Sequence, residues 1–106
     1  MTISERFRQL FEMTVAETKR LRDSLPSEAD KALDCLERGI AELASQVENV
    51  GEIPQFQLES KLSPVLLKAH GYLDRGRVLL EKLGFEREGA IVWELEQLLY
   101  RLLNDL

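Results

Sequence analysis

The 106-residue chain has only one cysteine, Cys35, and one histidine, His70, and aromatic residues make up just 7% of it. A single cysteine excludes an internal disulfide and suits a reducing compartment, so we expect a cytoplasmic protein. No stretch without a charged residue exceeds about six residues, whereas a membrane-spanning helix takes roughly 20 apolar residues. The charged residues Arg6 and Arg8 lie where a secretory signal needs a continuous apolar run.

Sites for metals, cofactors and covalent chemistry also lack their usual residue patterns. No HxxE, ExxH or CxxC spacing occurs, so we expect neither a metal site nor a bound cofactor. No nucleophile is matched with a base at a spacing typical of an active site, and we expect a protein that is not an enzyme. The net charge of −5 argues against binding to nucleic acids or anionic membranes.

Apolar residues recur in alternating steps of four and three over two long stretches of the chain. This spacing averages 3.5 residues, which is the period of a helix that packs along another helix. With 44% hydrophobic and 31% charged residues, the composition is typical of a globular helical protein. We therefore predict one all-α domain over 1–106, an antiparallel up-down-up-down four-helix bundle with left-handed, coiled-coil-like packing. The two seams consist of Ala29, Leu33, Leu36, Ile40, Leu43, Val47 and Val50, and of Leu62, Leu66, Ala69, Leu73, Gly76, Leu80 and Leu83.

Helix-capping and helix-breaking residues set the expected boundaries. Thr2 and Glu5 have the spacing of a capping box, and Pro26 ends the first helix. Ser27 is a suitable N-cap for the second helix, and Gly51 suits the left-handed position that follows it. The four helices are expected over about 3–25, 27–50, 63–83 and 86–105.

The start of the third helix has two interpretations. Ser63 followed by Pro64 has the pattern of an N-cap with proline at the first helical position, which predicts a start near 63. Alternatively, one helix runs from Gln55 and is kinked at Pro64. In the first case a short helical turn at 55–61 caps one end of the core with Phe56 and Leu58.

Two glycines near the third helix have distinct expected roles. Gly76 occupies a seam position, so we expect a neighbouring helix to approach closely there. Gly84 follows the last seam residue and should end the helix.

Charge alternates in sign from helix to helix. The four segments carry net charges of +1, −4, +2 and −3, and Glu52 lies in the linker between the second and third. In an up-down-up-down bundle, every pair of adjacent helices would then be of opposite sign. Since exposed ion pairs contribute only about 0.2–1 kcal/mol each, we expect this pattern to specify neighbours more than to stabilise the fold.

The fourth helix has a wider apolar surface than one core requires. Its aliphatic residues cover about 140° of the helix, and Trp93 and Tyr100 extend this arc to roughly 220°. Either this helix is the most buried, or it also faces a second chain. We predict a partner surface made of Trp93, Leu99, Tyr100 and Leu103.

His70 and Cys35 are the candidates for chemical roles. A four-helix bundle with one histidine on a helix face has the format of a histidine phosphotransfer domain, with His70 as phosphoacceptor. However, Asp74 lies one turn from His70. It would repel a phosphate, and the simpler interpretation is a boundary histidine paired with Asp74. Cys35, flanked by acidic residues, is expected to be a passive, partly buried thiol.

The leading hypothesis is a small interaction module that binds another protein, as a homodimer or as an adaptor or chaperone-like binder. Histidine phosphotransfer at His70 is the alternative. A second alternative is a helical transcription-associated regulator, although the basic cluster at Lys19, Arg20 and Arg22 is short and lacks interleaved aromatic residues.

Overall fold

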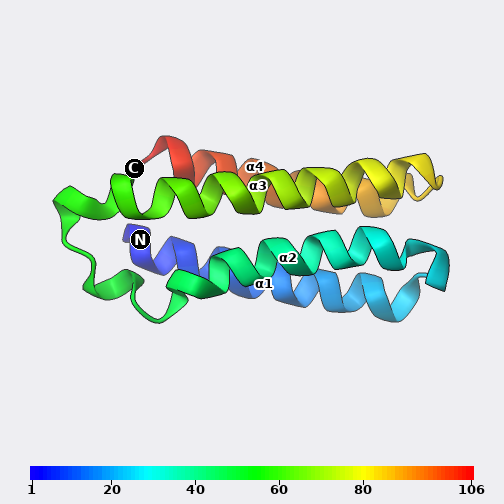
Figure 1. The fold of residues 1–106 in the computed structure, drawn as a ribbon, viewed down its shortest axis with the longest axis horizontal. Helices are drawn as coiled ribbons and strands as arrows, with labels where there is room; N and C mark the ends of the chain where they lie inside the picture. Colours follow the sequence, from blue (N-terminus) through cyan, green and yellow to red (C-terminus); the bar gives the residue numbers. More distant parts are fainter.

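The computed structural model describes residues 1–106 and confirms an all-α four-helix bundle. The four helices run antiparallel along a rod of 43 × 21 × 20 Å, with both termini at the same end (Figure 1). None of the helices combines the length and the apolar character that crossing a bilayer requires. The helices are α1 (Ile3–Ser24), α2 (Asp30–Val47), α3 (Leu58–Lys82) and α4 (Glu86–Asn104), and short 3-10 turns occupy Ser27–Ala29, Val50–Glu52 and Gln55–Gln57.

The two predicted seams form most of the central core. All residues of the first seam are buried except Ile40 and Val47, which are half-buried, and in the second only Leu83 is exposed. The helix α1 contributes Phe7 and Leu10 to the same core, together with two buried threonines. Contacts between α2 and α3 and between α3 and α4 are extensive, whereas those between α1 and α4 are sparser.

The close approach expected at Gly76 is confirmed, and Gly39 of α2 allows a second close approach in the same α2–α3 junction. A Cβ atom on Gly76 would lie 2.6 Å from the Leu36 side chain and 3.0 Å from the Ala32 carbonyl oxygen. On Gly39 it would lie 3.3 Å from both the carbonyl oxygen of Ala69 and the side chain of Leu73. Small residues on both helices therefore let the α2 and α3 backbones come close together.

The first helix start and the third helix end follow the predicted capping chemistry. Thr2 Oγ1 accepts a hydrogen bond from the Glu5 amide at 3.1 Å. Gly84 has φ of +89°, and the Phe85 amide donates to the Leu80 carbonyl at 2.9 Å. This is the Schellman arrangement, which satisfies carbonyls at the end of a helix.

Two other capping predictions were wrong. Ser27 makes no capping hydrogen bond and instead begins a 3-10 turn that leads into α2. Gly51 does not have a positive φ. Its place is explained by Arg8 of α1, whose Nη2 would lie 3.0 Å from a Cβ at Gly51 and whose Nε donates to the Val47 carbonyl. A side chain from another helix thus caps α2, and local sequence does not reveal it.

The predicted start of the third helix near Ser63 was also wrong. α3 begins at Leu58 and contains Pro64, as in the alternative of one longer helix. Proline inside a helix costs about 3 kcal/mol, but the earlier start buries Leu58 and Leu62, each worth about 1.5–3 kcal/mol. Phe56 does not cap the core, because its side chain is 84% exposed.

The ion pairs between helices follow the alternation of charge. In each of them an arginine of α1 or α3 meets an acidic residue of α2 or α4 or of the C-terminal end of α4, as the segment charges predict. They join Arg22 to Asp30, Asp34 and Glu37, Arg77 to Glu96, and Arg6 to Asp105.

Candidate functional site

The apolar arc of α4 is wider than the bundle covers. Val92, Leu95, Leu99 and Leu102 are buried at its centre. On the side facing α3, Trp93 and Tyr100 are about half exposed, and on the side facing α1, Ile91 and Leu98 are half-buried. α4 therefore presents apolar atoms along both of its edges.

Leu99 does not belong to the predicted partner surface. Its exposure is 0%, because it lies between Leu95 and Leu102 in the middle of the buried arc. Trp93 and Tyr100, with the half-buried Leu103, remain at the surface and form what we call the aromatic edge.

The aromatic edge packs against polar groups of α3. The guanidinium carbon of Arg77 lies 5.2 Å from the centroid of the Trp93 ring, within the range of a cation–π contact. The Tyr100 ring lies 6.4 Å from the His70 ring. Both aromatic rings therefore flank a polar region of their own chain, while about half of each ring faces solvent.

That polar region is a charge cluster centred on Glu96 and Arg77. Glu96 has no exposed surface, and its Oε2 accepts a hydrogen bond of 2.9 Å from Arg77 Nε. The other nitrogens of Arg77 donate to Asp74 at 2.6 Å and to Glu81 at 2.9 Å. One guanidinium thus holds three carboxylates, and it compensates in part for the burial of Glu96.

Burial and neighbouring charge change the protonation equilibria of the cluster. Burial, aided by the nearby Asp74 carboxylate, raises the pKa of Glu96 to about 7. The hydrogen bond from Arg77 lowers the pKa of Asp74 and, in turn, raises that of Arg77. Glu96 therefore exchanges its proton near neutral pH, whereas Asp74 stays ionised well below it.

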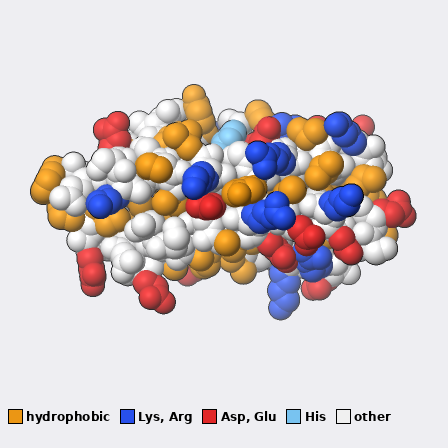
Figure 2. Space-filling view, viewed as in Figure 1, with side chains coloured by type: hydrophobic (Ala, Val, Ile, Leu, Met, Phe, Trp, Pro, Cys, Tyr) orange, Lys and Arg blue, Asp and Glu red, His pale blue; other side chains and the backbone are white.

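His70 borders this cluster, but it is not paired with Asp74 as expected. Asp74 bonds to Arg77, and His70 Nε2 faces Oε1 of Glu96 at 3.8 Å. This Glu96 oxygen is buried and has no hydrogen-bond partner. In Figure 2 the single histidine, in pale blue, reaches the surface beside hydrophobic atoms at the border of α3 and α4. A phosphate on Nε2 would meet the carboxylates of Glu96 and Asp74, which disfavours its binding there.

No group of three or more His, Cys, Asp or Glu residues is arranged to hold a metal ion. Cys35 is half-buried and borders a shallow surface cavity of about 310 Å³ with Val78 and Leu79.

Sequence reasoning missed the burial of Glu96, although a signal was present. At 100° per residue, Glu96 falls between Leu103 and Tyr100 on the helical wheel, inside the 220° arc of α4. From Ile91 onward, it is the only charged residue within that arc. A charge enclosed by apolar positions indicates a partner on the facing helix, and Arg77 is that partner.

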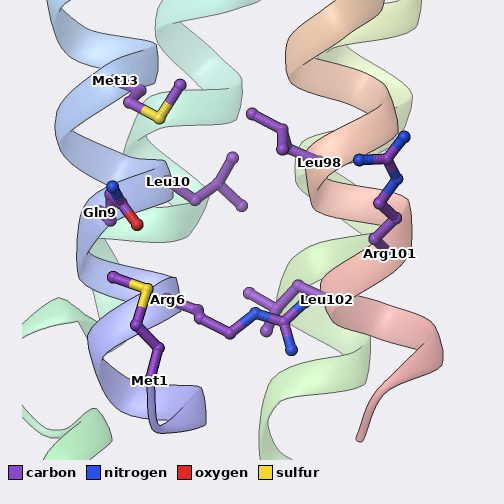
Figure 3. A pocket seen from close by; sticks show the side chains of 8 residues that line it. All are labelled: Met1, Arg6, Gln9, Leu10, Met13, Leu98, Arg101 and Leu102. Carbon is purple, nitrogen blue, oxygen red and sulfur yellow. The ribbon is translucent and has the colours of Figure 1, made fainter.

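The opposite edge of α4 borders an apolar groove against α1. Two adjoining cavities of about 230 and 240 Å³ lie along this junction, and Met13 and Leu98 border both of them. In Figure 3, Leu10 and Met13 of α1 point toward Leu98 and Leu102 of α4 across the groove. We call this surface the α1–α4 groove. Its remaining lining residues are Met1, Arg6, Gln9 and Arg101 in the first cavity and Glu17, Ile91, Glu94 and Leu95 in the second.

Comparison of the chain with protein families, with curated proteins and with solved structures gives no match.

Proposed function

We propose that this protein is a small, non-enzymatic interaction module that binds another protein chain through α4. The observation that carries the proposal is the uncovered apolar arc of this helix. Its centre is sealed in the core, yet the half-exposed Trp93 and Tyr100 on one edge and the half-buried Leu98 on the other remain in contact with solvent. Apolar and aromatic side chains on a rigid helix are typical of protein interfaces.

Of the two edges, the α1–α4 groove is the more favourable docking surface. Trp93 and Tyr100 already contact Arg77 and His70, so a partner would have to compete with or build on those contacts. In the groove, Met13 and Leu98 border both cavities with apolar side chains, and methionine adapts readily to the shape of a partner.

A role in catalysis or phosphotransfer has less support. The carboxylates and arginine of the charge cluster satisfy one another, and the nitrogen of His70 that would take a phosphate faces Glu96. We further propose that the protein acts in the cytoplasm, where its free Cys35 stays reduced.

Site-specific photocrosslinking in living cells tests the proposed function. A benzophenone amino acid would replace Leu98 in the groove or Trp93 in the aromatic edge, with Ala41, exposed on α2, as the control position. We expect a discrete adduct from an α4 position and none from position 41. Mass spectrometry of the adduct identifies the partner chain, and the absence of adducts from both α4 positions would contradict the proposal.

A further inference from the structure

The charges that flank the α1–α4 groove are arranged with opposite signs at its two ends. Arg6 and Arg101 border the first cavity, and Glu17 and Glu94 border the second. Each end thus has one charge from α1 and one from α4, both of the same sign. The apolar centre lies between the two ends, where both cavities meet.

This pattern has the symmetry of a two-fold axis across the groove. On α4, Glu94 and Arg101 lie at nearly equal distances on either side of Leu98. On α1, the midpoint between Arg6 and Glu17 lies one to two residues before Met13. This offset between the midpoint and Met13 is about 2–3 Å along the helix axis. Since Met13 and Leu98 border the same two cavities, both midpoints fall at about the same level of the bundle.

We infer that the partner in the groove is a second copy of this chain, related by a two-fold axis that passes near Met13 and Leu98. The axis lies in the plane of the interface and perpendicular to the helices. α1 then lies antiparallel against the partner's α1, and α4 antiparallel against the partner's α4. The inference depends on the proposed function, and it names the partner for that interaction.

Charge complementarity selects this antiparallel arrangement. It brings Arg101 of each copy opposite Glu94 of the other, and the Arg6 end opposite the Glu17 end. A parallel arrangement would bring arginine against arginine and glutamate against glutamate, which costs affinity. Arg101 and Glu94 make no ion pair within their own chain, so both are free to pair across the axis.

The other two charges that border the groove, Arg6 and Glu17, already form ion pairs within their own chain. Arg6 bonds to Asp105 at 2.8 Å, and Glu17 bonds to Arg20 at 2.8 Å. These pairs are partly exposed, so they weaken the contribution of the Arg6 and Glu17 ends without reversing its sign. The contacts between Arg101 and Glu94 should therefore dominate, and symmetry makes two of them in each dimer.

The dimensions of the face agree with a stable interface. The bundle is 43 Å long and about 20 Å across, and α1 and α4 form one of its four sides. A standard interface takes about 800 Å² from each partner, which is the area of such a side. The half-buried Leu98 and the exposed Met13 would supply its apolar centre.

Charge reversal with complementation tests the inference. In Glu94→Arg, both symmetric contacts become arginine against arginine, and in Arg101→Glu both become glutamate against glutamate. We expect each single variant to raise the dimer dissociation constant about tenfold or more in analytical ultracentrifugation. An equimolar mixture of the two variants should form a heterodimer of nearly wild-type affinity, because every contact regains an opposite pair.

Two controls separate this result from general charge or folding effects. Glu48→Arg changes the net charge by the same amount as Glu94→Arg, but at an exposed position beyond the end of α2. It should leave the dissociation constant unchanged. Helical circular dichroism of the single variants should match that of the wild type, and recovery on mixing shows that both chains remain folded.

Three results would overturn the inference: a wild-type chain that stays monomeric, a dimer insensitive to both reversals, or single variants that do not recover on mixing. If photocrosslinks from position 98 or 93 then identify a different protein, the proposed function stands and only the second copy is excluded. If Trp93→Ala dissociates a charge-insensitive dimer, the interface lies at the aromatic edge.

Discussion

The helix pairs α2–α3 and α1–α4 lie in the same bundle but differ in the size of the side chains between them. Gly39 and Gly76 let the α2 and α3 backbones approach closely, and the leucines beside them are fully buried. Between α1 and α4, Met13 and Leu98 border open cavities instead. Small residues thus seal one junction within the chain, whereas the other junction, with larger and more flexible side chains, stays open, and there we propose that a second chain binds.

Truncation of a leucine at each junction should expose this difference most strongly. Leu73 is fully buried against Gly39, so Leu73→Ala should lower the free energy of unfolding by about 2–5 kcal/mol. Leu98→Ala should cost only about 1 kcal/mol, because Leu98 is half-buried beside a groove that is already open. Urea denaturation at low protein concentration measures both, and equal losses would contradict the contrast.

Replacement of Glu96 by glutamine should change how stability depends on pH. The folded-state pKa of Glu96 is raised to about 7, so the folded protein holds a proton that the unfolded chain releases above pH 4.5. This part of the stability is complete below pH 4.5 and is lost as the pH rises to about 7.

Glu96→Gln should remove that decline. As the pH rises from 5 to 8, the free energy of unfolding of the variant should therefore increase relative to that of the wild type by on the order of 1–3 kcal/mol, since one pKa unit corresponds to about 1.4 kcal/mol. Chemical denaturation at the two pH values provides the comparison. Because Asp74 has a lowered pKa and loses its contribution only in acid, the variant should retain the wild-type fall in stability below about pH 4. Identical slopes between pH 5 and pH 7 would exclude an elevated pKa at Glu96.

The two glycines of α3 should respond in opposite directions to alanine. At Gly76 a methyl group would lie 2.6 Å from Leu36 and 3.0 Å from a backbone oxygen, so Gly76→Ala should destabilise by about 1–3 kcal/mol. At Gly71 no atom lies within 4 Å of a Cβ, so Gly71→Ala should stabilise by about 0.5–1 kcal/mol. Thermal unfolding of the pair gives the signs, and a stabilising Gly76→Ala would show that the helices are not in close contact.

The buried threonines of α1 should have the smallest effects. Thr18 Oγ1 is buried without a hydrogen-bond partner, so Thr18→Val should be neutral or stabilise by up to about 1 kcal/mol. Thr14 Oγ1 donates to the Leu10 carbonyl at 2.7 Å, and Thr14→Val should not gain stability. Parallel urea titrations compare the two, and a clear loss from Thr18→Val would indicate a partner for its hydroxyl group.

The four helices and most of the core could be predicted from the sequence because period and capping are local properties. The seam leucines, the Thr2 cap and the Gly84 stop each depend on residues within one or two turns. The predicted start of α3 was wrong because burial of Leu58 and Leu62 outweighed the preference of Pro64 for the first turn of a helix.

The surfaces of the candidate site were less accessible to prediction. The aromatic edge followed from the helical wheel of α4, but Leu99 was misplaced because the wheel does not show where the core is centred. The groove requires Met13 and Leu98 to meet from opposite ends of the chain, and their contact is set by tertiary packing. The sequence does contain the alternating charges that border it, but their two-fold relation appears only once α1 and α4 lie side by side.

The arrangement of two copies across the groove is tested most directly by distances between identical spin labels. In a chain with Cys35 replaced by serine, a single cysteine for the spin label would replace Glu12, near the axis, or Lys19, two turns farther along α1. Pulsed electron paramagnetic resonance should give a short distance between the two copies of position 12. Between the two copies of position 19 the separation along the helix should be greater by about 20 Å, because each lies about 10 Å from the axis. Equal distances at the two positions, or no dipolar coupling at either, would contradict an antiparallel pair of bundles.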